Sequence, residues 1–205
     1  MKIIRIREQI KEVDQESRFS RETWDAVDIG RRKVILQQYT DEMARIMGVS
    51  IGQVNFEDWD YPPNRLGFYS HGGSTRYDLP ERTAWVNPSS FDPANDGQDR
   101  QPSFEAVMSV VRHEVRHAYQ HSILDDAVSF PPQSRFTIRG LDESLGSNYT
   151  SPPDPLPKGP HLPETKKAYR EQRRDYRNQI SEVDAFAFGR GHDREMIGWL
   201  VVDQW

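Results

Sequence analysis

The chain has 205 residues, a formal net charge of −5 and no cysteine. The lack of cysteine excludes disulfide bonds and thiolate metal ligands, so any metal site must use His, Asp or Glu. The negative net charge gives no general electrostatic case for binding nucleic acid or an anionic membrane. Apolar residues are only 35% of the chain, but five Trp, eight Tyr and nine Phe can bury large areas. We expect a single domain, 1–205, with long polar loops.

Targeting signals are not visible in the sequence. Residues 1–18 are charged throughout and lack the apolar stretch of a signal peptide. No apolar run approaches the length of a membrane span. We therefore expect a protein that stays in the cytoplasm or leaves the cell by a route without a signal peptide, and that has no membrane partner.

The first 49 residues predict a helical region. Ile3, Ile6 and Ile10 fit a helix in residues 1–18, although 2–6 could also begin as a strand. A firmer helix is predicted from Ser20, its N-cap, to Gly48, with a weak point near Gly30.

Short strands are expected between this region and the next helix. Leu66–Ser70, Thr75–Leu79 and Arg82–Asn87 alternate or are rich in aromatic residues, and glycines and prolines separate them. They predict a small antiparallel sheet.

Phe104–Gln120 reads as a helix capped by Ser103, and it should end near Asp125. It is apolar nearly all round in its middle, which is typical of a buried helix. Within it lies the H-E-x-x-H sequence of His113, Glu114 and His117. Residues four apart share one helix face, so the two imidazoles can bind one Zn²⁺ while Glu114 acts as the general base on its flank.

A catalytic zinc ion normally has a third protein ligand. His121 lies about 12 Å along the helix axis from His113, too far to share the ion, and we assign it a structural or supporting role. The pattern of the metzincin proteases fails, because Gln120 and Ile123 occupy its glycine and third-histidine positions.

A carboxylate on another element should therefore complete the site. Glu143 is one candidate. Glu182 is the better one, because it lies in an apolar helix where a carboxylate needs a strong partner. Asp184 faces elsewhere on that helix and could orient a histidine ligand.

The C-terminal third begins with a Pro-rich excursion, 129–163, that could cover or shape the site. One long helix is predicted from Pro163 to about Phe188. Its basic run, Lys166–Arg177, is most simply a solvated helix face.

These motifs resemble the gluzincin-type HExxH zinc metallopeptidases, including the ImmA/IrrE-type proteases and the peptidase domains of phage and polymorphic-toxin proteins. The resemblance covers about residues 50–190, including strands at 67–69 and 84–88. The matching residues of the two motifs are His113, Glu114, His117, Glu182, Asp184, Ala185, Phe188 and Gly189. It implies an α+β, zincin-like fold, in which a small sheet packs on the motif helix and a second helix carries a glutamate ligand.

The function predicted from these features is a zinc-dependent endopeptidase that acts on a protein or peptide substrate. Tyr149, Tyr176 and His192 are candidates for stabilising the oxyanion. The resemblance also implies a role as a bacterial effector or toxin, with an inhibitor or immunity protein as partner. Two alternatives stay open: a metal-dependent hydrolase of a non-peptide amide, and an inactive zincin scaffold that binds a protein or, through its basic run, nucleic acid.

Overall fold

The structure is a computed structural model that describes residues 2–56, 66–70, 82–93, 103–125 and 163–189. The described part is mostly helical, with one two-stranded antiparallel sheet. Its elements, in chain order, are α1 (Lys2–Asp14), a 3₁₀ turn η1 (Ser17–Phe19), α2 (Arg21–Asp25), α3 (Ile29–Met47), β1 (Gly67–Ser70), β2 (Thr83–Val86), a 3₁₀ turn η2 (Pro88–Ser90), α4 (Phe104–Asp125), α6 (Pro163–Arg177) and α7 (Ile180–Gly189). No described helix combines the length and the apolar character needed to cross a membrane.

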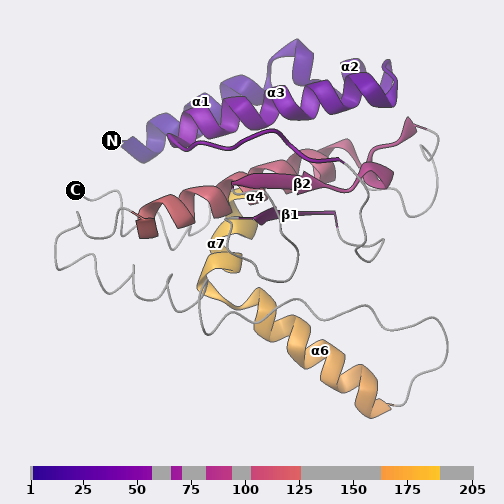
Figure 1. Ribbon diagram of the computed structural model, residues 1–205, viewed down its shortest axis with the longest axis vertical. Coiled ribbons are helices and arrows are strands. Elements are labelled where there is room, and N and C mark those ends of the chain that lie inside the picture. Colours follow the sequence, from indigo (N-terminus) through magenta and orange to yellow (C-terminus); the bar gives the residue numbers. More distant parts are fainter. Residues whose placement is uncertain (1, 57–65, 71–81, 94–102, 126–162, 190–205) are drawn as a thin grey trace.

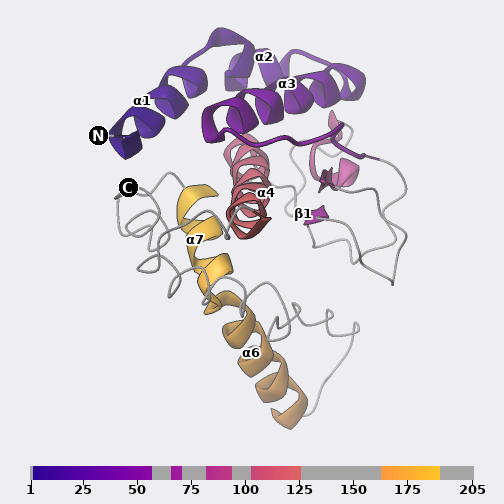
Figure 2. The ribbon, with the colours of Figure 1, turned by 60° about the vertical axis from the view of Figure 1, so that its left-hand side comes forward.

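Helix α4 lies at the centre of this arrangement. It contacts α3 on one side and both strands and α7 on the other. Figures 1 and 2 show α1, α2 and α3 as a layer over α4, with the sheet along one flank of α4, α7 below it, and α6 leading away from the rest. The helix with the H-E-x-x-H motif is thus enclosed by other elements, as its apolar surroundings predict.

The N-terminal layer follows the predicted capping residues, with one correction. Ser20 Oγ accepts a hydrogen bond from the Thr23 N–H, and Gly48 ends α3 in the left-handed region at φ 72°. The helix predicted from Ser20 to Gly48 is in fact two, because Asp28 caps a new helix by accepting the Arg31 N–H at 2.8 Å. Residues 2–6 are helical, so the strand alternative was wrong.

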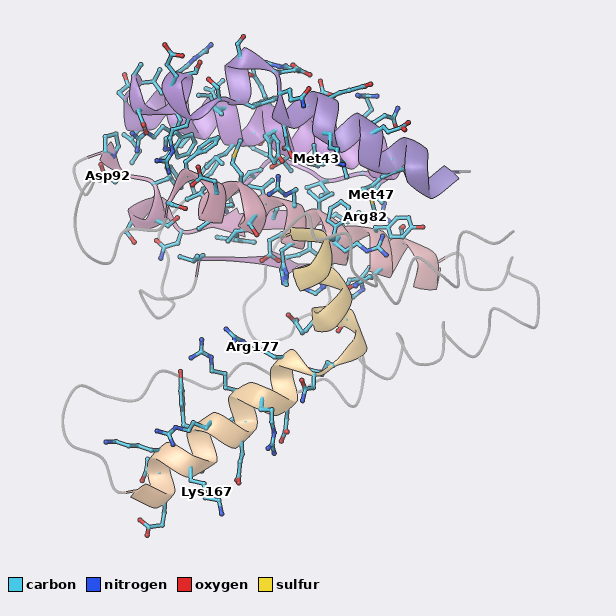
Figure 3. All side chains as sticks on the ribbon, turned by 180° about the vertical axis from the view of Figure 1, so that it is seen from behind. Met43, Met47, Arg82, Asp92, Lys167 and Arg177 are labelled. Atoms are coloured by element: carbon cyan, nitrogen blue, oxygen red, sulfur yellow. The ribbon has the colours of Figure 1, made fainter. Side chains whose placement is uncertain are left out.

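The main core lies between α3 and α4. Figure 3 labels Met43 and Met47 on α3, and both side chains are buried. They belong to a cluster of buried residues that also includes Val13, Phe19, Trp24, Ile35, Leu36, Tyr39, Ile46, Val54, Val86, Phe91, Val107, Met108, Val111, Val115 and Phe188. Aromatic rings meet edge to face within it, as in the pair Phe19 and Tyr39 at 5.2 Å between centroids.

The sheet consists of β1 and β2 in the register Gly67 opposite Val86 and Ser70 opposite Thr83. Two of the three predicted strands are therefore present, and Thr75–Leu79 lies outside the described residues. On its other side β2 forms a parallel bridge from Trp85 to Asn55. β2 therefore has backbone partners on both of its edges, and both strands contact α4.

The long helix predicted from Pro163 to about Phe188 was wrong, because it is two helices that part at Asn178 and Gln179. The described side chains of α6 are exposed apart from Tyr169, which is half-buried. In α7, by contrast, Ser181, Glu182, Ala185 and Phe188 are buried. The break lets the apolar α7 turn onto α4 while the charged α6 remains in solvent.

Small residues at intervals of four bring α7 close to α4. Ser181 and Ala185 are fully buried, and Gly189 follows one turn later. A Cβ atom added at Gly189 would lie 2.8 Å from the backbone oxygen of Ser109 and 3.3 Å from Cβ of His113. The spacing of the two helices therefore depends on the lack of a side chain at this position.

Arg112 ties this pair of helices to the N-terminal layer. Its Nε donates to the carbonyl oxygen of Gly189 at 3.0 Å, and its Nη1 donates to Asp14 at 3.1 Å and to the Tyr39 hydroxyl at 2.7 Å. The Tyr39 hydroxyl in turn donates to Asp14. Burial, together with Asp14, raises the pKa of Tyr39 well above its usual value, so this hydroxyl keeps its proton.

We expect Gly189→Ala to destabilise the protein by about 1–3 kcal/mol, because the new methyl group overlaps backbone that cannot move cheaply. Helix propensity alone would favour Ala over Gly by about 1 kcal/mol. A net loss of stability in Gly189→Ala would therefore indicate that α7 lies too close to α4 for a methyl group. Urea denaturation measures the change. Gly52→Ala is the control: its Cβ would lie 3.7 Å from the Arg82 carbonyl oxygen, an ordinary contact. Equal stabilities for the two variants would contradict the proposed role of Gly189.

Candidate metal centre

Helix α4 places the two motif histidines side by side. His113 and His117 are one turn apart, and their rings meet edge to face with centroids 4.6 Å apart. Their Nε2 atoms lie only 3.0 Å from each other. Both residues are 9% exposed, so the imidazoles converge on one point at the margin of the core.

Helix α7 brings the predicted carboxylate to the same point. Glu182 is 1% exposed, and it lies in the first turn of α7. One carboxylate oxygen is 3.5 Å from His113 Nε2, and the other is 3.5 Å from His117 Nε2. The structure thus brings together the three residues that the sequence analysis selected as ligands, from segments more than 60 positions apart.

The three side chains form a donor set that could hold a metal ion. Ligand atoms placed about 2.0–2.1 Å from a tetrahedral ion are about 3.3 Å from one another. The observed separations of 3.0 and 3.5 Å lie on either side of that value. Two imidazoles and one carboxylate are also a ligand set that Zn²⁺ adopts in catalytic sites. The residues present therefore fit a zinc ion.

The electrostatics of the cluster favour a cation. Burial by itself lowers the pKa of His113, but hydrogen bonding to Glu182 and the charges of Glu114 and Glu182 outweigh it, and the pKa is raised. The carboxylates thus stabilise positive charge on or near this imidazole. A proton and a metal ion would compete for the same nitrogen, so metal affinity should rise with pH.

The predicted general base lies beside the donor set. Glu114 is 4% exposed and follows His113 directly in α4. Strand β1 passes over it: a Cβ added at Gly67 would lie 3.4 Å from a carboxylate oxygen of Glu114 and 2.5 Å from the side chain of Val110. Glycine at this position lets the strand lie directly against the helix near its acidic side chain.

His121 is one turn beyond His117 and is not part of the donor set. Its ring contacts that of Tyr69 on β1, with centroids 5.8 Å apart. Tyr69 was not among the site residues predicted from the sequence. A search for aromatic residues on the strand nearest the motif helix would have found it.

Other predicted site residues lie beyond what the structure describes. Asp184 is on α7 and Tyr176 is on α6, but the positions of their side chains are not described. Tyr149, His192 and the other ligand candidate, Glu143, lie outside the described residues altogether. The suggested roles of these side chains therefore stay predictions.

Gln120 is the most informative residue that the sequence analysis missed, since it appeared there only as a mismatch to the metzincin pattern. Its side chain is 1% exposed. Its Oε1 lies 2.9 Å from His117 Nδ1, and its Nε2 donates to the carbonyl oxygen of Ser181 at 3.0 Å. The spacing of three from His117 places it on the same helix face, a signal that was present in the sequence.

We expect the purified protein to bind one Zn²⁺ per chain and Glu182→Ala to lose it, because two histidines alone leave the ion without its third protein ligand. Metal content after dialysis, measured by mass spectrometry, checks this. Glu164→Ala is the matched control, since Glu164 also lies in the first turn of a helix but is exposed. If Glu182→Ala keeps its zinc, the assigned third ligand is wrong.

No protein-family model, curated protein or solved structure matches this chain. The convergence of His113, His117 and Glu182, with the residues around them, is therefore the feature that points to a function.

Proposed function

We propose that this chain is a zinc-dependent endopeptidase with a zincin-like fold. The observation that supports the proposal is the buried donor set of His113, His117 and Glu182, with Glu114 next to it on the same helix. A histidine pair spaced i and i+4, a glutamate after the first histidine, and a glutamate from a second helix are the parts that such a hydrolase requires.

Zn²⁺ held by the three ligands would act as a Lewis acid on the scissile carbonyl and make water a better nucleophile. The chain's own contribution to the proton transfers is Glu114. Its carboxylate takes the proton of the attacking water and then delivers it to the leaving amine. Burial of Glu114 against Gly67 holds the carboxylate in one place, so little reorganisation is needed during the reaction.

A peptide substrate must bring its carbonyl close to Glu114, which places it along β1. The peptide could in principle add as a strand to Thr83–Asn87. That strand is already paired on both sides, by β1 and by the bridge from Asn55 to Trp85. Strand β1 is the one that passes over Glu114. We therefore assign the substrate-binding role to β1.

The oxyanion of the tetrahedral intermediate needs a hydrogen-bond donor. Tyr149, Tyr176 and His192 remain candidates from the sequence. The contact between Tyr69 and His121 adds two more donors, on the strand and the helix that also position Glu114. Replacing each tyrosine by phenylalanine and each histidine by glutamine would rank these candidates by their effect on kcat.

Glu114→Gln should retain zinc but lose about 10²–10⁴-fold in peptide-bond hydrolysis, because the amide keeps the shape of the side chain and cannot accept the proton. Cleavage of a mixture of unstructured peptides, followed by mass spectrometry, gives the rate. Glu105→Gln is the matched control on the same helix, since its carboxylate is exposed and forms an ion pair with Arg21. Full activity of Glu114→Gln would show that Glu114 is not the general base.

The same peptide mixture separates the proposal from its nearest rival. A zinc hydrolase of a non-peptide amide would bind the metal and need Glu114, but it would cleave none of the peptides. A screen of small amides after chelation and re-addition of zinc would then identify its substrate class.

One observation favours a binding function as a second candidate. The six Lys and Arg residues of α6 fall on one stripe of the helix by its 3.6-residue period, and the described side chains around them are exposed. This pattern matches a surface for a polyanion such as duplex DNA. Binding that weakens steeply with added salt, without any proteolysis, would favour this candidate.

A further inference from the structure

The side chain of Gln120 connects the two helices that carry the candidate ligands. Gln120 belongs to α4, its Oε1 lies 2.9 Å from Nδ1 of His117 on the same helix, and its Nε2 donates to the backbone of α7 at Ser181. Ser181 immediately precedes Glu182 and is fully buried. The amide of Gln120 thus contacts the candidate ligand His117 directly, and it contacts Ser181, the residue before the candidate ligand Glu182.

The orientation of this amide follows from its partner on α7. A backbone carbonyl oxygen can only accept a hydrogen bond, so the group of Gln120 that faces Ser181 must be the NH₂. The opposite orientation would place two acceptors 3.0 Å apart. The oxygen of the amide is therefore the group that faces His117.

The orientation of the amide in turn fixes the tautomer of His117. Because Oε1 of Gln120 accepts only, Nδ1 of His117 must carry the hydrogen that lies between them. In the neutral imidazole the other nitrogen, Nε2, then has its lone pair available. Nε2 is the atom that lies 3.0 Å from His113 Nε2 and 3.5 Å from Glu182, so the lone pair is directed at the donor set.

We propose that Gln120 is a positioning residue that makes His117 competent as a ligand and holds the start of α7, and with it Glu182, in register with α4. The proposal deepens the zinc peptidase function and rests on it where metal affinity is concerned, but the effect on the tautomer does not require a metal. Gln120 does not itself touch the substrate or the reacting atoms.

Two substitutions separate the contact of Gln120 with His117 from its contact with Ser181 of α7. Gln120→Met has a similar volume but removes both hydrogen bonds. Gln120→Glu keeps an acceptor for the Nδ1–H of His117, while its carboxylate no longer donates to the carbonyl of Ser181. Thr40→Val is the matched control, because it removes a buried hydrogen bond, from Oγ1 to the Leu36 carbonyl oxygen at 2.8 Å, in α3.

The first measurement is the tautomer of His117 in the metal-free protein, from its imidazole ¹⁵N chemical shifts at a pH where the ring is neutral. We expect the Nδ1–H form in the parent protein, in Gln120→Glu and in Thr40→Val. Gln120→Met should shift toward the Nε2–H form. If Gln120→Met keeps the Nδ1–H form, or Gln120→Glu loses it, Gln120 does not set the tautomer.

The second measurement is zinc affinity, from competition with a chelator. Gln120→Met should bind zinc about 10–100-fold more weakly than the parent, the usual effect of losing a group that orients a metal ligand. The zinc affinity of Gln120→Glu should lie between those of the parent and Gln120→Met. Thr40→Val should lose thermal stability without a change in zinc affinity. Parental affinity in Gln120→Met would overturn the positioning role.

Failure of the proposed function gives a different result. In that case the parent protein itself binds no zinc, or binds it without hydrolysing peptides. The change of tautomer in Gln120→Met would still support the role of Gln120 in orienting His117.

Discussion

A carboxylate buried between two imidazoles is the interaction on which the rest of this structure depends. Glu182 lies 3.5 Å from both His113 and His117, and it is removed from solvent almost completely. Burying an ionised carboxylate is costly unless cationic or hydrogen-bonding partners surround it. The two helices that carry these groups must therefore be held at a fixed, short distance. Small residues on the facing side of α7 and the amide of Gln120 meet that requirement.

The parts of the molecule that could be predicted from the sequence are those set by local spacing. The helix Phe104–Asp125 begins after its cap at Ser103 and ends at the predicted residue, because capping and a continuous apolar stripe are properties of neighbouring residues. The pairing of His113 with His117 follows from the helical period alone. Glu182 could be selected because a carboxylate in an apolar helix requires a partner, wherever that partner lies in the chain.

The features that sequence reasoning missed depend on contacts between distant segments. Residues 164–188 contain no Gly or Pro that would predict a break, and the turn at Asn178 and Gln179 exists because α7 has an apolar surface to cover while α6 does not. The bridge from Asn55 to Trp85, which gives β2 a partner on its second edge, is likewise a long-range contact. The hydrogen bond from Gln120 to Ser181 spans 61 positions, so its partner could not be named before α4 and α7 were placed together.

Arg112 connects the N-terminal layer to the two helices that carry the candidate ligands, a link that the sequence does not reveal. Arg112 immediately precedes His113 in the sequence. Its guanidinium hydrogen-bonds to Gly189 at the end of α7, to Asp14 on α1 and to Tyr39 on α3. Removal of the first fourteen residues by a processing protease would take away Asp14, one of the groups that hold Arg112 in place. The amino-terminal segment is therefore a built-in brace for the helices that carry the candidate ligands, and trimming it would loosen their arrangement without removing any of the three.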